Sequence, residues 1–189
     1  MTGRSRSVGR VTGRIPAGTL STLRPINFAI ARLASRVVGA PDMHLFSTLG
    51  QTRGLFRAWL VYSARLMPFG TLARRDAETV ILRVAAVREC GYEQDHHRRL
   101  GRRAGLTAAE IAALEHTDAA THGDLDERAR TVVTAVDELL AEQDLAEATW
   151  TRLGAYLTDR QRIEFVLLVT QYDGLATTIR TLRIPRDYT

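Results

Sequence analysis

The sequence of 189 residues contains no lysine, because all 26 of its basic residues are arginine. A Schiff-base mechanism and the phosphate-binding lysine of a P-loop both need a lysine amine, so neither is available. Cys90 is the only cysteine. This excludes an internal disulfide, a C-x-x-C redox pair and any thiolate-rich zinc or iron–sulfur site. A chain with so little cysteine is typical of a reducing compartment, and we expect a cytoplasmic protein.

Long apolar runs are also absent from the chain. No apolar span of about 18 residues occurs, and no apolar segment of about 7–15 residues follows the basic start. We therefore expect neither membrane insertion nor secretion. Apolar residues make up 45% of the chain and charged residues 25%, which is typical of one ordinary globular domain.

The formal net charge of +5 is distributed unevenly. Residues 1–36 hold seven arginines and no acidic residue, whereas the rest of the chain holds 19 arginines and 21 acidic residues. The basic excess thus belongs to the start of the chain, and we expect no nucleic-acid-binding surface on the body. Residues 1–24 are rich in Gly, Ser, Thr and Arg and lack an apolar stripe. This predicts a flexible Arg-rich tail, 1–24, ahead of one domain, 25–189.

From Pro25 onward, apolar residues recur at steps of three and four, a periodicity that predicts an all-α body. A first helix is expected over 26–38, ended by the stop signal at 39–41, and another over 93–104, ended by Gly105. The other expected features are helices over 75–89 and 124–142, and starts at the capping pairs Thr107 with Glu110, Asp144 with Glu147, and Thr158 with Gln161.

Side chains capable of chemistry gather in one stretch, Cys90-Gly-Tyr-Glu93-x3-His97. On a helix that advances about 100° per residue, these three side chains fall within a sector of about 60°. Glu93 and His97 stand at i and i+4, a spacing at which a carboxylate can fix the tautomer of an imidazole and tune its pKa. The stretch therefore predicts a site for proton transfer.

Each candidate also has a purely structural interpretation. Cys90 could be a small buried hydrophobe, although its place beside a predicted helix start would favour the thiolate. Glu78, on the preceding helix, could pair with a neighbouring arginine. His96 should point about 100° away from His97, into solvent or into a layer around the site. Glu93 and His97 are two of the three ligands that a metal site needs, so we expect no metal.

These residues and their surroundings resemble the carboxymuconolactone decarboxylase-like superfamily, which also contains the alkylhydroperoxidase D proteins. The resemblance implies a compact bundle of about seven to nine helices, a cofactor-independent enzyme and a homo-oligomer, as a dimer, trimer or hexamer. It covers roughly residues 40–189 and is carried by Ala77–Ala85, Cys90–Glu93 with His97, Arg103–Thr107, Leu157–Gln161, Tyr172–Ala176 and Arg183–Pro185. Aromatic residues on several helix faces also favour self-association: Phe46, Phe56, Trp59 and Trp150.

The peroxidase branch of this superfamily uses a glutamate, two cysteines and a histidine as a proton relay and a redox disulfide. The matching positions here are Glu78, Cys90, Glu93 and His97, so a glutamate replaces the second cysteine. Without a resolving thiol the disulfide cycle cannot operate. Tyr-Glu followed by His instead resembles the decarboxylase-type branch, although Gln94 stands where an aromatic residue often follows the glutamate.

We therefore expect an enzyme of the lyase type that applies general acid/base chemistry to a small carboxylated or lactone-type substrate. His97 would transfer the proton, Glu93 would orient it, and Glu78 with Cys90 would complete the polar pocket. Two alternatives stay open. One is a one-cysteine peroxidase-like antioxidant protein that oxidises Cys90, and the other is a non-catalytic helical oligomer that binds a partner.

Overall fold

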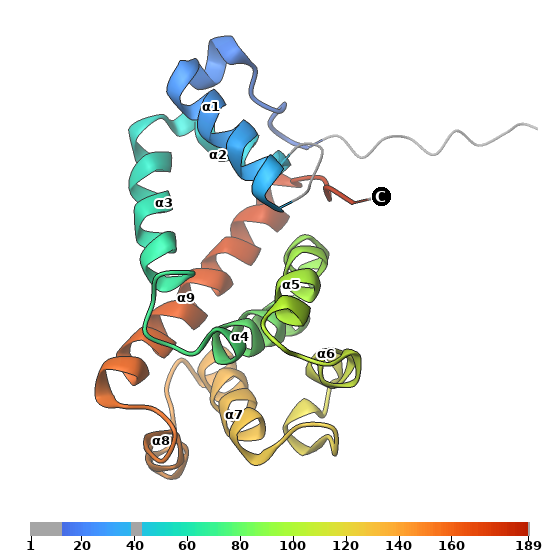
Figure 1. The fold of residues 1–189 in the computed structure, drawn as a ribbon, viewed down its shortest axis with the longest axis vertical. Helices are drawn as coiled ribbons and strands as arrows, with labels where there is room; N and C mark the ends of the chain where they lie inside the picture. The colour runs from blue at the N-terminus through green and yellow to red at the C-terminus, as the bar shows by residue number, and fades with distance from the viewer. Residues whose placement is uncertain (1–12, 39–42, 189) are drawn as a thin grey trace, which may run out of the picture.

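The computed structural model describes residues 13–38 and 43–188, which form helices joined by short turns (Figure 1). These residues contain nine α-helices, two 3₁₀ helices and no β-strand, which confirms the expected all-α bundle. The α-helices are α1 (Leu20–Val38), α2 (His44–Leu49), α3 (Gly54–Leu66), α4 (Arg74–Val87), α5 (Gly91–Arg103), α6 (Ala108–Glu115), α7 (Glu127–Glu142), α8 (Glu147–Gly154) and α9 (Asp159–Leu182). The 3₁₀ helices are η1 (Gly50–Thr52) and η2 (Ala119–Thr121).

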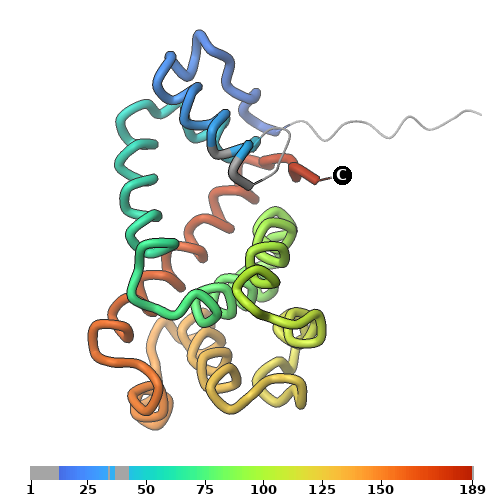
Figure 2. The backbone as a smooth tube through the Cα atoms, viewed as in Figure 1, coloured from blue at the N-terminus to red at the C-terminus, as the bar shows by residue number. Residues whose placement is uncertain are grey.

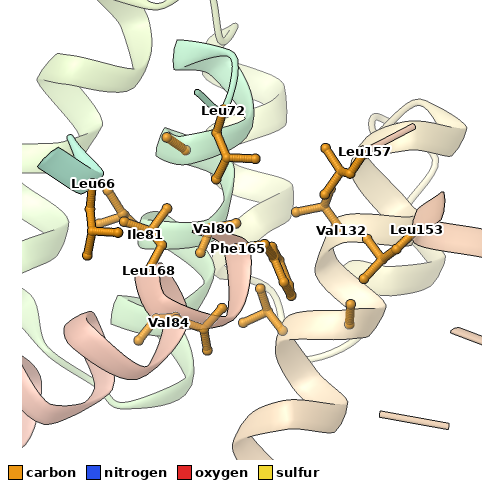
Figure 3. Close-up of a cluster of buried hydrophobic side chains, with 14 residues drawn as sticks. Leu66, Leu72, Val80, Ile81, Val84, Val132, Leu153, Leu157, Phe165 and Leu168 are labelled. Atoms are coloured by element: carbon orange, nitrogen blue, oxygen red, sulfur yellow. The ribbon is translucent and has the colours of Figure 1, made fainter. Parts of the chain in front are cut away.

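Helix α4 lies at the centre of the bundle, in contact with α5, α6, α7 and α9. Residues 76–85 are all buried because neighbouring helices cover this segment. Figure 3 shows Val80 and Val84 of α4 in one cluster with Val132 of α7 and Phe165 of α9. Burying an apolar side chain of this size stabilises the fold by about 1.5–3 kcal/mol. The polar residues of α4 are thus held on a well-packed helix.

The long helix α9 joins two parts of the molecule. Its first half packs on α4, α7 and α8, and its second half runs toward α2 and α3 (Figures 1 and 2). Leu175 and Ile179 on that second half share a buried cluster with Leu45 of α2 and with Cys90 and Tyr92 at the start of α5. Helix α9 therefore fixes the position of the start of α5 relative to α4, α7 and α8 on one side and to α2 and α3 on the other.

Two of the three expected capping pairs are confirmed. Thr107 with Glu110 opens α6, and Thr158 with Gln161 opens α9, each pair through reciprocal hydrogen bonds between side chain and backbone. The expected stop at Gly105 is confirmed too, because this glycine has a φ of 93°, a value that residues with a side chain rarely adopt.

The third expected cap, Asp144 with Glu147, is wrong. Helix α8 begins at Glu147 after Ala146, and no side chain of the preceding residue caps it. The carboxylate of Glu138, on α7, accepts hydrogen bonds from the Ala146 N–H at 3.2 Å and from the Thr149 hydroxyl at 2.7 Å. A neighbouring helix thus supplies the acceptor that the local sequence was expected to supply.

Helix α1 begins at Leu20, earlier than the expected start at Ile26. It contains a kink at Arg24, whose φ is 65°, and Pro25 follows directly. Proline is favoured in the first turn of a helix, so Pro25 marks the start of the second, straight stretch of α1. Pro25 therefore lies directly after the kink in α1, and a further turn of the helix, from Leu20, precedes the kink. The expected stop at 39–41 lies outside the described residues.

The segment ahead of α1 contacts the body of the molecule. The N–H of Arg14 donates to the carbonyl of Leu182 at 2.9 Å, and the N–H of Gly18 donates to the carbonyl of Ser47 at 3.1 Å. Residues 13–24 therefore include ordered contacts, whereas residues 1–12 lie outside the described part of the chain. The division into a tail at 1–24 and a domain at 25–189 stays a prediction.

Three of the aromatic residues expected to favour self-association pack on one another within the chain. Phe46, Phe56 and Trp59 have ring centroids 5.7–6.2 Å apart, and Phe56 is only 1% exposed. Phe56 is thus covered by its own chain, whereas Phe46 and Trp59 stay partly exposed, and the homo-oligomer stays a prediction. Within 13–38 and 43–188, none of the helices has the length and apolar character needed to cross a bilayer.

Candidate active site

The turn between α4 and α5 brings the predicted site residues together. Glu89 has a φ of 51°, and Cys90 follows as the residue that precedes the first turn of α5. The N–H groups of both residues donate to carbonyls of the last turns of α4, at 3.0 and 2.8 Å. Helix α5 then packs along α4. As a result, Glu93 and His97 on α5 face Glu78 on α4.

His97 lies between two carboxylates. Its Nδ1 is 2.7 Å from Oε2 of Glu78, in a hydrogen bond, and its Nε2 is 3.5 Å from Oε2 of Glu93. All three side chains are buried, with exposed fractions of 0% for Glu78, 4% for Glu93 and 5% for His97. The ring of Tyr172, on α9, meets the His97 ring edge to face at 5.2 Å. The sequence predicts that Glu93 orients His97, but the hydrogen bond to the His97 ring is made by Glu78, and Glu93 lies farther away.

Burial and charge shift the pKa values of these groups. Burial raises the pKa of Glu93, and the negative charge of Glu78 adds to that rise, while His97 and His96 oppose it. Burial lowers the pKa of His97, but the Glu78 carboxylate and then the Glu93 carboxylate outweigh burial and raise it overall. The pKa of Tyr172 is raised by burial and by the same two carboxylates. The cluster therefore holds protons that exposed groups would release.

Arg74 extends this cluster toward the surface. Its Nη2 lies 2.9 Å from Oε1 of Glu78, an ion pair one helical turn apart. This ion pair lacks hydrogen-bond geometry, so the buried Oε1 of Glu78 has no hydrogen-bond partner. The other terminal nitrogen of Arg74, Nη1, is also buried and has no hydrogen-bond partner. The Tyr172 hydroxyl likewise makes no hydrogen bond to the described residues. We call Arg74, Glu78, Glu93, His97 and Tyr172 the inner cluster.

Cys90 lies beside the inner cluster, packed in an apolar environment. Its side chain is 7% exposed and packs with Leu175, Ala176 and Ile179 of α9. Burial raises the pKa of the thiol to about 11, and the nearby Glu93 charge adds to this, although backbone N–H groups at the start of α5 oppose it. The sequence expected this helix start to favour the thiolate. That expectation is wrong, because burial outweighs the helix end.

An adjacent face of α5, about 100° around the helix, holds a second polar cluster, formed by His44, Tyr92, His96 and Asp187. The Asp187 carboxylate accepts from the Tyr92 hydroxyl at 2.5 Å, from His96 Nε2 at 2.8 Å, and from the His44 backbone N–H at 3.0 Å. His44 Nδ1 lies 2.6 Å from the same carboxylate. We call these four residues the outer cluster. His96 is thus buried and paired with a carboxylate, rather than solvated.

The sequence predicts Glu78, Glu93 and His97 in one cluster, and the alternative expectation that Glu78 pairs with a neighbouring arginine is confirmed at Arg74. Tyr172 was not predicted as a member. Arg74 carries a local signal, since it stands four residues before Glu78 on the same helix. Tyr172 has no local signal, because it comes from α9, far along the chain. Within the described ranges, no three His, Cys, Asp or Glu side chains are arranged to hold a metal ion.

Part of the chain matches a known protein family. Residues 53–138, which include Arg74, Glu78, Cys90, Glu93 and His97, match the Carboxymuconolactone decarboxylase family. No curated protein matches the chain closely enough to count as a relative.

Several solved structures share the fold. An uncharacterized peroxidase-related protein from Ralstonia eutropha JMP134, described as an alkylhydroperoxidase AhpD core, has a TM-score of 0.82 at 16% identity and covers 95% of both chains. A peroxidase-related protein from Silicibacter sp. TM1040 has a TM-score of 0.82 at 13% identity, covering 97% of this chain and 96% of that chain. A variant of the debrominase Bmp8, in complex with 2,3,4-tribromopyrrole, has a TM-score of 0.72 at 12% identity over 91% of both chains. At such identities the likeness shows the fold alone, and the match of residues 53–138 shows that this part of the chain is similar to the Carboxymuconolactone decarboxylase family.

Proposed function

We propose that the protein is an enzyme that applies general acid/base chemistry at His97 to a small carboxylated or lactone-type substrate. The observation that carries this proposal is the buried series Glu78, His97 and Glu93, with contacts of 2.7 and 3.5 Å to the two imidazole nitrogens. One nitrogen is anchored and the other faces an acid of raised pKa. A histidine held in this way is suited to proton transfer near neutral pH.

The roles follow from the distances. Glu78 fixes the orientation of the His97 ring through Nδ1, which leaves Nε2 as the nitrogen that exchanges a proton. Glu93 lies next to Nε2 and holds its own proton above the usual range, so it can share the proton with His97. In a decarboxylation beside a carbonyl, the electron pair left by CO₂ moves into the carbonyl as an enolate. Protonation of the enolate carbon by His97 would complete the reaction.

Two features support a carboxylated substrate with an apolar body. The buried Nη1 of Arg74 has no hydrogen-bond partner, and an arginine is well suited to bind a carboxylate. A mostly apolar pocket of about 360 Å³ lies between α3 and α9, lined by Trp59 and Phe56 on one side and Gln171 and Leu175 on the other. These two α9 residues flank the turn that carries Tyr172, the residue in contact with His97.

The test begins with a thermal-shift screen of small carboxylic acids and lactones, followed by a turnover assay of the compounds that bind. His97→Gln keeps a hydrogen-bonding side chain but cannot carry a titrating proton, so turnover should fall about 10²–10⁴-fold. His116→Gln is the matched control, because His116 is exposed and lies outside the inner cluster. It should turn over like the wild type. Full turnover by His97→Gln would contradict the proposal.

A thiol-based reaction at Cys90 is the second candidate. Its supporting observation is that backbone N–H groups of Tyr92 and Glu93 face the thiol at the start of α5 and lower its pKa, although burial outweighs them. Cys90→Ser separates the two candidates, since a hydroxyl can replace a thiol in a pocket wall but cannot replace a redox nucleophile. Loss of activity in Cys90→Ser with activity retained in His97→Gln would favour the thiol. Absence of turnover in the wild type, with every compound that binds, would favour a non-catalytic binding protein.

We also propose that the protein works as a homo-oligomer. Apolar side chains on the surface of α3 and α9 remain exposed in the single chain, namely Leu55, Val61, Ile163 and Leu167. Apolar surface of this kind commonly marks an interface. Light scattering should therefore give a mass that is a multiple of the chain mass of 21.0 kDa at micromolar concentration. A stable monomer would contradict this prediction.

A further inference from the structure

A groove of about 430 Å³ lies where the start of α5 meets the end of α9 and the C-terminal segment. Its lining contains four arginines, Arg88, Arg180, Arg183 and Arg186, and one acidic residue, Glu89. Cys90 also lines the groove, whereas the residues of the inner cluster do not. This volume is within the range of about 300–1,000 Å³ that is usual for small-molecule sites.

Two of these arginines are held in place by carboxylates. Arg88 Nε donates to Asp173 at 2.6 Å, and Arg186 donates to both oxygens of Asp95 at 2.6 and 2.5 Å. Arg186 also packs against Gly91, where a Cβ atom would lie 3.2 Å from its Nη1. The charges of these two guanidinium groups are therefore compensated, and the groups form walls of the groove.

The other two arginines, Arg180 and Arg183, have no ion-pair or hydrogen-bond partner for their side chains among the described residues. Arginines at the end of a helix often bind the last free carbonyl groups. Here backbone N–H groups already donate to the carbonyls of Ile179, Arg180 and Leu182, at 3.0, 3.2 and 2.9 Å. The end of α9 therefore does not require these two guanidinium groups, and their charge is available to a ligand.

The start of α5 adds further positive potential to the same groove. A helix N-terminus carries about half a positive charge, and Cys90 provides no capping hydrogen bond for it. The pKa of the Cys90 thiol is raised to about 11, chiefly by burial, so the thiol stays neutral at physiological pH. Among the groove residues, only Glu89 supplies a negative charge to oppose the unpaired arginines.

We propose that this groove binds a small molecule with at least one oxyanion group, a carboxylate or a phosphate, between Arg180, Arg183 and the start of α5. A guanidinium group offers paired N–H donors that match two oxygens of such a group. The inner cluster contributes no residue to this groove, so the proposal does not depend on the proposed acid/base function. It adds a second ligand site to the molecule.

Isothermal titration calorimetry of the full chain tests the proposal, with inorganic phosphate and succinate as the two probes. The test variant is Arg180→Gln with Arg183→Gln. The matched control is Arg102→Gln with Arg103→Gln, which makes the same change in charge at two exposed arginines of α5 outside the groove. We expect saturable binding of one ligand per chain to the wild type and the control, and affinity at least about 10-fold lower in the test variant.

Thiol alkylation supplies a second measurement, because Cys90 is the only cysteine and lines the groove. A bound probe should slow the alkylation of Cys90 in the wild type and not in the Arg180/Arg183 variant. Binding of phosphate alone would identify a phosphorylated ligand, and binding of succinate alone a carboxylated one. Absence of saturable binding of both probes up to about 10 mM would overturn the proposal. Equal weakening in test variant and control would also overturn it, since that pattern indicates attraction to net charge alone.

Discussion

The two faces of α5 carry similar side chains in different states. On the outer face, four donors surround the single carboxylate of Asp187, and its pKa is lowered even though burial alone would raise it. On the inner face, two carboxylates share one imidazole, that of His97, and the pKa of Glu93 is raised by burial. On the outer face, hydrogen bonds therefore compensate the negative charge of the carboxylate. On the inner face, one imidazole compensates the charge of the two carboxylates only in part.

This difference separates a structural cluster from a candidate reaction site. A buried charge with all its hydrogen bonds made stabilises one arrangement of the chain. The outer cluster does this for the C-terminal segment, since Asp187 connects it to His44 of α2 and to His96 of α5. The inner cluster keeps one oxygen of Glu78 and one nitrogen of Arg74 without a hydrogen-bond partner, and a substrate could bind to these atoms.

The largest expected effect comes from removing one carboxylate from each face. Asp187→Asn leaves Tyr92 and His96 facing an amide instead of a carboxylate, and it should lower the free energy of unfolding by about 3 kcal/mol. Glu93→Gln removes a charge that burial already disfavours, so it should change that free energy by at most about 1 kcal/mol. Urea unfolding at neutral pH measures both values.

Asp144→Asn is the control for this comparison, because Asp144 is exposed and a change there should stay within about 0.5 kcal/mol. Equal losses of stability in Asp187→Asn and Glu93→Gln would contradict the distinction between the two faces.

The pH dependence of stability should run in opposite directions on the two faces. The pKa of Asp187 is lowered by folding, so its stabilisation is complete above its unfolded pKa of about 3.9 and is lost as the pH falls through the folded value. The pKa of His97 is raised, so its stabilisation is complete below its unfolded pKa of about 6.5 and is lost as the pH rises through the folded value.

Unfolding in urea from about pH 3 to pH 9, on the wild type, Asp187→Asn and His97→Gln, checks this prediction. The difference between wild type and Asp187→Asn should shrink in acid, and the difference between wild type and His97→Gln should shrink in alkali. Differences that stay constant across the range would show that neither group changes its pKa on folding.

The sequence predicts the inner face better than the outer one, because the two differ in the range of their contacts. Glu93 and His97 are one helical turn apart, so helical periodicity alone places them on one face. Glu78, on another helix, is predicted as a site residue by its match to the pattern of the resembled family. The outer cluster joins His44 to Asp187, which are 143 residues apart, and no local pattern indicates such a pairing.

Two properties of the inner face were also beyond sequence reasoning. Periodicity gives the direction of a side chain but no distance, so it could not show that Glu78 lies closer to His97 than Glu93 does. The pKa of Cys90 depends on the apolar side chains of α9 packed over it, and those come from a distant part of the chain. The helices themselves were largely predictable, except that α1 begins before the expected Ile26 and that Asp144 does not cap α8.

The smallest expected effect concerns one hydroxyl on each face. Tyr92→Phe removes a buried hydrogen bond to the charged Asp187 and should lower the free energy of unfolding by about 2 kcal/mol. Tyr172→Phe removes a hydroxyl without a hydrogen bond to the described residues, so stability should change by at most about 0.5 kcal/mol while turnover slows. Tyr62→Phe, at a 39% exposed tyrosine, is the control and should change neither. A loss of stability in Tyr172→Phe as large as that in Tyr92→Phe would mean that the inner hydroxyl is already bonded in the folded chain, and the inner face would then be a structural cluster like the outer one.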